Sequence, residues 1–387
     1  MLSEYAMQPS NLPNCCHARC WSGCACCKKR RIYLCKMFSC CLFLIIFLTQ
    51  SVSAGEYFDQ YGLSPGSLPV DLGVQPLGYP SGVISVVMQH DRILQRALKN
   101  SNTPLKTHPF KRGADMVALL ADKRLEAGLI GDMPTILAAA SGHVFIAGLV
   151  KQATTSIVAR EGVRIDSLAG KRIGYVEASS AHHTLLQGLV AAGVKGSQVT
   201  LIPISIADMP EALARGQIDA FSAWEPAPSI ALGQNPENHV IFRGVSTDYF
   251  VLERNFVKRS PELALQLLAG FVRAVEWMRR SQHNAEKAVR WAIADAEKFS
   301  GKSNSLSVKQ IVMITHREIL DIPSAPVILL DPASPPLQKQ FQFLQSLNKL
   351  PTDASWENLK RAMHYDGLPK IFADRQAYQL RSYDYEE

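Results

Sequence analysis

The chain has 387 residues, of which 47% are hydrophobic and 19% charged, a composition typical of a globular protein with one large or two ordinary domains. Its formal charge of +7 is concentrated at the N-terminus. Removing residues 1–54 takes away six basic residues and one acidic residue and leaves +2. This balance argues against nucleic acid as a partner.

Residues 1–54 have the order of a secretory signal. Lys28–Arg31 is a basic cluster, an apolar run follows over 37–48, and Val52 and Ala54 supply small residues at −3 and −1 of a cleavage site. The apolar run is too short for a comfortable membrane span. We therefore predict cleavage after Ala54 and a mature protein in the periplasm.

All nine cysteines lie between Cys15 and Cys41, so a chain cleaved after Ala54 contains none. Such a chain suits an oxidising compartment without relying on disulfides. The first six cysteines could bind zinc, but they lack two C-x2-C pairs separated by a loop. We favour an overlong start, with the true start further in, and we predict no metal site. These six are Cys15, Cys16, Cys20, Cys24, Cys26 and Cys27.

From Leu68 onward, short apolar strands alternate with amphipathic helices, which predicts an α/β sheet of mostly parallel strands. Asp115 and Asp132 are expected to cap helices, and Pro134 follows the second cap closely. In this first part, strands are expected over 68–75, 105–110, 127–130, 144–149 and 155–160, and helices over 83–98, 115–121 and 134–140.

The pattern restarts at Leu168 with a turn, a strand over 172–176, a polar elbow and a helix. Ser179 or Ser180 is the expected N-cap, because apolar residues then recur at helical spacing. A helix that begins at the end of a strand leaves free N–H groups there, which favour an anion. A capped unit without any ligand is the alternative. Beyond it we expect strands over 199–204, 218–223, 240–243 and 249–252 and a helix over 208–215.

One helix–strand unit recurs at a constant offset of 93 residues. This favours two similarly built lobes, although chance similarity of two such units is the alternative. The matching residues are Asp115, Met116, Leu120, Leu125, Glu126 and Ala127 in the first copy and Asp208, Met209, Leu213, Ile218, Asp219 and Ala220 in the second.

The strand over 218–223 ends in Trp224 and Glu225. Ligands of open α/β sheets lie outside the carboxyl ends of strands, so both residues are candidates for ligand contact. Trp224 can equally be a core aromatic, and Glu225 a solvated loop charge. Downstream, helices are expected over 263–280, 285–299, 308–319, 336–347 and 354–362, followed by a frayed tail over 378–387.

The order of these motifs resembles that of the periplasmic solute-binding proteins of ABC importers for nitrate, aliphatic sulfonates, taurine and the thiamine pyrimidine precursor. The resemblance covers about Leu68 to Trp277. The phrases that carry it are Glu126–Pro134, Leu168–Gly174, Ser179–His182 and Asp219–Pro226. One departure is Ala178, where many relatives have glycine.

The resemblance implies a two-lobe periplasmic binding protein type II fold, in which each lobe is a mainly parallel sheet flanked by helices and a helical C-terminal extension follows. It implies a first lobe over 68–157, a second over 158–248, a return to the first lobe over 249–375 and a tail over 376–387. It places ligand contacts at Gly78, Tyr79, Ser81, Asp132, Met133, Ser179, Ser180, His182, Trp224 and Glu225.

On this basis we expect the protein to capture a small anionic or zwitterionic solute and deliver it to a membrane permease and its ATPase. Helix N-termini would hold the anion, and Glu225 would pair with an amine. We expect a monomer without a cofactor. Two alternatives remain: an enzyme of the thiamine-pyrimidine type, and a periplasmic ligand sensor. His182 and His183 do not favour a metal, because neighbouring helical side chains point about 100° apart.

Overall fold

The computed structural model describes residues 61–65, 69–320 and 336–385. The predicted signal peptide over 1–54 and the cysteines lie outside the described residues. In the part of the chain that is described, no helix is long and apolar enough to cross a membrane.

One eight-stranded sheet runs through the described residues in the order β2-β1-β3-β8-β4-β7-β5-β6. β1 pairs in parallel with β2 and β3, and β5 pairs in parallel with β6 and β7, whereas β4 and β8 run antiparallel to their neighbours. The strands are β1 Val70–Val74, β2 Leu105–Pro109, β3 Ala127–Gly131, β4 Val144–Ala159, β5 Arg172–Tyr175, β6 Thr200–Pro203, β7 Ala220–Ala223 and β8 His239–Glu253.

The two long strands correct the sequence prediction. β4 and β8 are single strands of 16 and 15 residues, whereas the sequence predicted two short strands in place of each. They pair almost from end to end, with register shifts between Ile146 and Gly148, between Leu149 and Lys151 and between Ile157 and Val158. Bulges of this kind interrupt the alternation of side chains without ending a strand. As a result, the two groups of parallel strands, β1 to β3 and β5 to β7, belong to one continuous sheet.

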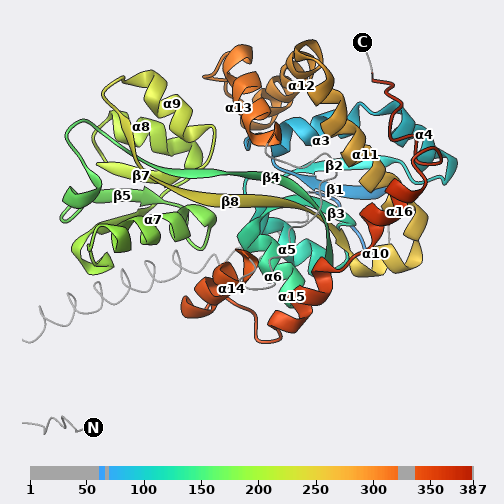
Figure 1. The fold of residues 1–387 in the computed structure, drawn as a ribbon, viewed down its shortest axis with the longest axis horizontal. Coiled ribbons are helices and arrows are strands. Elements are labelled where there is room, and N and C mark those ends of the chain that lie inside the picture. The colour runs from blue at the N-terminus through green and yellow to red at the C-terminus, as the bar shows by residue number, and fades with distance from the viewer. Residues whose placement is uncertain (1–60, 66–68, 321–335, 386–387) are drawn as a thin grey trace, which may run out of the picture. The chain divides into compact units, whose positions relative to one another are not determined.

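Helices cover both faces of this sheet. In the part built around β1, β2 and β3, called the first lobe below, α3, α11, α12 and α13 lie on one face and α5, α6, α14 and α15 on the other (Figure 1). In the part built around β5, β6 and β7, called the second lobe below, α8 and α9 lie opposite α7. Their bounds are α3 Ser81–Gln89, α4 Arg92–Asn100, α5 Gly113–Ala121, α6 Asp132–Ala140, α7 Ser180–Ala191, α8 Met209–Ala214, α9 Ala227–Gln234, α10 Arg254–Arg259, α11 Pro261–Arg280, α12 Gln282–Ser300, α13 Val308–Leu320, α14 Pro336–Ser346, α15 Trp356–Met363 and α16 Gly367–Ala373.

Several helix predictions need correction. The helix predicted over 83–98 is two helices, because the Asp91 carboxylate caps α4 by accepting the N–H groups of Ile93 and Leu94. Asp115 and Asp132 lie inside the first turns of α5 and α6 and are not their N-caps. A charge in the first turn also favours a helix start, so sequence alone does not separate the two positions.

The C-terminal tail packs against the first lobe, contrary to the prediction that it is frayed. Arg273 and Asp91 form a fully buried ion pair of 2.8 Å, and the Arg273 guanidinium also donates to the Tyr378 carbonyl. Tyr385 pairs with Asp91 through a β-bridge, and its ring lies 4.3 Å from that of Trp277. These contacts bind the end of the chain to α4 and α11.

Candidate functional site

Two charged residues face each other on the long central strands. Lys151 on β4 is paired in register with Asp248 on β8, and their charged groups lie 3.6 Å apart. The Lys151 side chain is buried. A buried ammonium requires neighbouring carboxylates, and the residues described below supply them.

The starts of α3 and α6 meet the same part of β8. The Ser81 hydroxyl donates a hydrogen bond to the Asp248 carboxylate. Oδ2 of Asp132 accepts the Thr247 N–H at 3.3 Å and the Gln340 side-chain amide at 2.6 Å, and Oδ1 accepts the Met133 N–H at 2.8 Å. Two of the predicted site residues, Ser81 and Asp132, are therefore brought to one place.

The Asp132 carboxyl group is unusually basic. Burial and the nearby Asp248 carboxylate raise the pKa of Asp132 to about 7, against hydrogen bonds from Thr247 and Met133 and the charge of Lys151. At neutral pH this group is therefore divided between its neutral and charged forms.

The other predicted residues of the first lobe are used within the fold. Tyr79 is buried in the core, and its hydroxyl accepts a hydrogen bond of 2.8 Å from the Asn304 amide. Burial raises the pKa of Tyr79. Met133 is fully buried, and Gly78 closes a turn by donating its N–H to the Gln75 carbonyl.

In the second lobe, the structure confirms Ser179 as the N-cap of α7. Its hydroxyl accepts the His182 N–H at 3.3 Å and donates to the Val176 carbonyl at 2.6 Å. Ser180 is the first helical residue and is half-buried. Ala178 has a φ of +52°, a left-handed conformation that glycine adopts with less strain.

His182 is buried and neutral in this arrangement. Its Nδ1 accepts the Ala178 N–H at 3.2 Å, so a neutral ring carries its proton on Nε2. Burial lowers the pKa of His182. The ring packs edge-on against Phe343 of α14 with the centroids 5.6 Å apart, and His183 also contacts Phe343 at 4.7 Å.

At the end of β7, Trp224 is half-buried and Glu225 is already paired. The Glu225 carboxylate accepts the Ser229 N–H at 3.2 Å and the Arg317 guanidinium of α13 at 3.1 Å. Arg317 thus takes the place that the sequence analysis expected a ligand amine to occupy. β7 and α7 are joined by Ser222, whose hydroxyl donates to the Ala181 carbonyl at 2.7 Å.

The sequence analysis missed the contribution of the C-terminal helices. α13 also carries Glu318, which accepts from Arg317 at 3.2 Å and whose pKa burial raises to about 7. α14 carries Gln340 and Phe343, and beyond it Lys349 lies 3.2 Å from Glu177 in the second lobe. One signal was available, because Gln340 interrupts an apolar helix face made by Leu337, Phe341 and Leu344.

Among the described residues, two cations and four carboxyl groups are linked near the centre of β4 and β8: Lys151, Arg317, Asp132, Asp248, Glu225 and Glu318. Within the described ranges, no group of three or more His, Cys, Asp or Glu side chains is arranged to hold a metal ion. These side chains offer hydrogen bonding and charge pairing.

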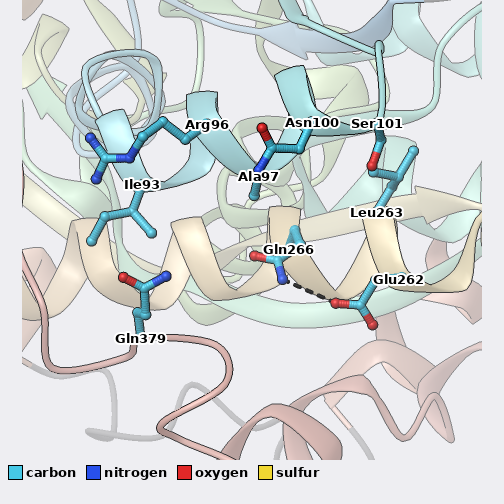
Figure 2. Close-up of a pocket in the computed structure, with 9 residues that line it drawn as sticks. All are labelled: Ile93, Arg96, Ala97, Asn100, Ser101, Glu262, Leu263, Gln266 and Gln379. Atoms are coloured by element: carbon cyan, nitrogen blue, oxygen red, sulfur yellow. Dashed lines mark hydrogen bonds between the residues drawn. The ribbon is translucent and has the colours of Figure 1, made fainter.

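A separate surface pocket of about 370 Å³ lies between α4, α11 and the tail residue Gln379 (Figure 2). The only hydrogen bond drawn there joins Gln266 to Glu262, at 3.0 Å. None of the predicted site residues lines this pocket.

Similarity searches relate this chain to proteins named for solute binding. It is 28% identical over 165 residues to an Escherichia coli (strain K12) protein named for binding aliphatic sulfonates, covering 41% of this chain and 51% of that protein. It is 27% identical over 175 residues to the taurine-binding periplasmic protein of the same organism, covering 43% and 54%. The chain thus matches about half the length of these curated relatives.

Solved structures extend the similarity at the level of the fold. The periplasmic aliphatic sulphonate binding protein SsuA from Escherichia coli aligns with a TM-score of 0.61 at 19% identity, over 78% of this chain and 99% of that one. The periplasmic nitrate-binding protein NrtA from Synechocystis PCC 6803 aligns at 0.57 and 14%, over 83% and 92%. The desulfurization enzyme DSZB aligns at 0.55 and 14%, over 80% and 100%.

The model of the NMT1-like family matches residues 69–294, more than half of the chain. This stretch includes every predicted ligand contact and ends before α13 and α14. The chain therefore belongs to the NMT1-like family and has the α/β fold of periplasmic binding proteins.

Proposed function

We propose that this protein is an extracytoplasmic solute-binding protein. It captures a small anionic or zwitterionic solute of the sulfonate, taurine or nitrate type between two lobes and delivers it to an ABC permease. The names of its relatives support this class of solute.

The observation that carries the proposal is the convergence of the starts of α3 and α6 on β8, through Ser81 and Asp132. In the second lobe, α7 begins at Ser180 behind a serine cap, and its first N–H groups have no partner within the helix. Such helix starts favour an anion. Lys151 and Arg317 add positive charge that the family resemblance did not predict.

The position of the lobes in the sequence is part of the same proposal. We retain a first lobe over 68–157 with a return over 249–375 and a second lobe over 158–248, joined by β4 and β8. A solute that contacts both lobes would favour their closed arrangement. The mature chain would start at Gly55, reside in the periplasm and act as a monomer with a permease and its ATPase.

A thermal-shift screen of residues 55–387 tests the proposal. The probes are alkanesulfonates, taurine, nitrate, amino acids and thiamine precursors. A ligand at 100 times its dissociation constant should stabilise the folded state by about 2.7 kcal/mol. If no sulfonate, taurine or nitrate stabilises the protein, the proposed class of solute is wrong.

Two further measurements separate binding from catalysis. Small-angle scattering with the bound solute should show a smaller radius of gyration, and mass spectrometry should recover the solute unchanged. The fold shared with a desulfurization enzyme keeps catalysis as the alternative, and a transformed solute would establish it. A sensor would bind in the same way, but transport would not depend on it.

Replacing Ser180 by Ala tests the second-lobe elbow. The loss of one hydrogen bond to a charged ligand should weaken the binding free energy of an anion by about 1.5–3 kcal/mol. Ser179→Ala is the matched stability variant, because Ser179 makes the cap and its loss should cost about 1 kcal/mol of folding free energy. Unchanged affinity of the Ser180→Ala protein in calorimetric titration would remove Ser180 from the site.

A further inference from the structure

A buried acceptor beside Asp132 is left unused. Gln340 is 7% exposed, and its Oε1 has no hydrogen-bond partner among the described residues. A buried carbonyl oxygen without a donor is costly, and folded proteins satisfy nearly all such groups.

The orientation of the Gln340 amide follows from its neighbour. Its Nε2 donates to Oδ2 of Asp132 at 2.6 Å, which fixes the nitrogen toward the carboxylate and leaves the oxygen free. Ser246 on β8 adds a second buried polar group, because its hydroxyl has no partner in the described part of the chain. Ser246 directly precedes Thr247, whose N–H donates to Asp132.

We propose that Gln340 is a solute-binding residue whose Oε1 accepts a hydrogen bond from an N–H group of the solute. The inference rests on the proposed function and narrows its solute class to molecules with an amino group, in preference to nitrate or a plain alkanesulfonate. Oε1 is an acceptor that cannot donate, so it is complementary to an ammonium group and not to a sulfonate oxygen.

The charges at the site agree with this choice. Among the described residues, four carboxyl groups lie around Lys151 and Arg317, and Glu225 is already paired with Arg317. The pKa of Asp132 is raised, so an ammonium group beside it would favour its charged form, whereas a ligand carrying only negative charge would not.

Gln340 also lies outside residues 69–294, the stretch that the family model matches. Its contribution therefore comes from the C-terminal helices of this chain. α14 reaches both lobes, through Gln340 to Asp132 in the first and through Phe343 to His182 in the second.

Calorimetric titration of the mature protein with taurine and with ethanesulfonate tests the proposal, because the two probes differ only by an amino group. The unmodified protein should bind taurine more tightly than ethanesulfonate. The Gln340→Leu substitution should weaken the affinity for taurine about tenfold to hundredfold. The same substitution should change the affinity for ethanesulfonate by less than about threefold. Gln342→Leu, at an exposed position of the same helix, is the control and should leave both affinities unchanged.

Gln340→Met and Gln340→Glu keep the test decisive if the Leu variant does not fold. The near-isosteric Met variant should lose the preference for taurine, whereas the Glu variant keeps an acceptor oxygen and should retain it. Equal weakening of both probes would reduce Gln340 to a structural role and overturn the inference.

Tighter binding of ethanesulfonate or nitrate than of taurine by the unmodified protein would also overturn the inference and leave the proposed function standing. Failure of every probe to bind would instead overturn the proposed solute class, and the inference with it.

Discussion

Glu126 and Asp219 lie 93 positions apart and occupy the same place in the two lobes. Each directly precedes a strand that joins one long central strand to a parallel neighbour: β3 between β8 and β1, and β7 between β4 and β5. The repeat found in the sequence therefore corresponds to a repeated backbone arrangement.

The hydrogen bonds at the two positions match. The Glu126 carboxylate accepts the Asp71 N–H at 3.0 Å, and its own N–H donates to the Asp71 carbonyl at 3.0 Å. The Asp219 carboxylate accepts the Arg172 N–H at 2.9 Å, and its own N–H donates to the Arg172 carbonyl at 2.8 Å.

The pKa values of the two carboxyl groups shift in opposite directions. Hydrogen bonds from Arg172, with Arg160 nearby, lower the pKa of Asp219 to about 2. Burial raises the pKa of Glu126 to about 7, and the Asp71 carboxylate adds to the rise despite an ion pair with Arg259. The same backbone arrangement thus holds carboxyl groups whose pKa values shift in opposite directions, because burial dominates at Glu126 and hydrogen bonds from Arg172 dominate at Asp219.

The largest expected effect follows from removing the Asp219 carboxylate in the second lobe. Asp219→Ala removes the acceptor of the Arg172 N–H and guanidinium and the partner of Arg160, so it should lower the free energy of unfolding by about 2–3 kcal/mol at pH 7. Urea denaturation measures this. Asp208→Ala, at an exposed position, should change it by less than about 0.5 kcal/mol. Equal losses of unfolding free energy in Asp219→Ala and Asp208→Ala would contradict a stabilising role of the Asp219 hydrogen bonds.

The second prediction concerns the first-lobe carboxyl group. A raised pKa means that the folded state binds more protons than the unfolded state between about pH 4.5 and 7. Its contribution to stability is therefore complete below about 4.5 and is lost as the pH rises through about 7. The free energy of unfolding of the Glu126→Gln protein, measured by urea denaturation, should therefore rise by about 2 kcal/mol relative to that of the unmodified protein between pH 5 and 8.

Asp219→Asn is the matched control for this pH dependence. Because the pKa of Asp219 is lowered, its contribution is present above about pH 4 and is lost only as the pH falls toward about 2. The difference between Asp219→Asn and the unmodified protein should therefore stay constant from pH 5 to 8 in urea denaturation. A constant difference for Glu126→Gln over the same range would contradict the raised pKa.

The smallest expected effect concerns the loop that follows β5 in the second lobe. Ala178 has a φ of +52°, so Ala178→Gly should relieve strain and stabilise the protein by about 0.5–1 kcal/mol. Ala181→Gly, inside α7, should instead destabilise it by about 1 kcal/mol. Thermal denaturation of both variants decides this, and a destabilising Ala178→Gly would show that Ala178 is not strained.

Much of the fold was predictable from local patterns. The core strands, the Ser179 cap of α7 and the long helix α11 all carry local signals, namely apolar periodicity, a capping residue and a proline in the first turn. The failures have physical reasons too. The bulges of β4 were mistaken for strand ends. The tail was predicted to be frayed because it is held by contacts with residues distant in sequence, from Tyr378 to Arg273 and from Tyr385 to Asp91.

The structure brings some of the predicted site residues together and uses others elsewhere in the fold. Ser81 and Asp132 meet at β8, but Tyr79 is buried in the core and Glu225 is paired with Arg317. Sequence reasoning placed residues at the ends of strands correctly. It did not assign their side chains to the core or to a neighbouring helix, because that depends on which element packs against them.

The sequence by itself determined the order of strands and helices, the recurrence of a helix–strand unit and the family to which the chain is similar, because these depend on residues close together in the chain. Only the tertiary structure decided the partners of the charged and polar groups. Gln340 and Asp132 are 208 positions apart, and Arg317 and Glu225 are 92 apart. Contacts at such separations leave no periodic pattern in the sequence, and they form only when the C-terminal helices pack against both lobes.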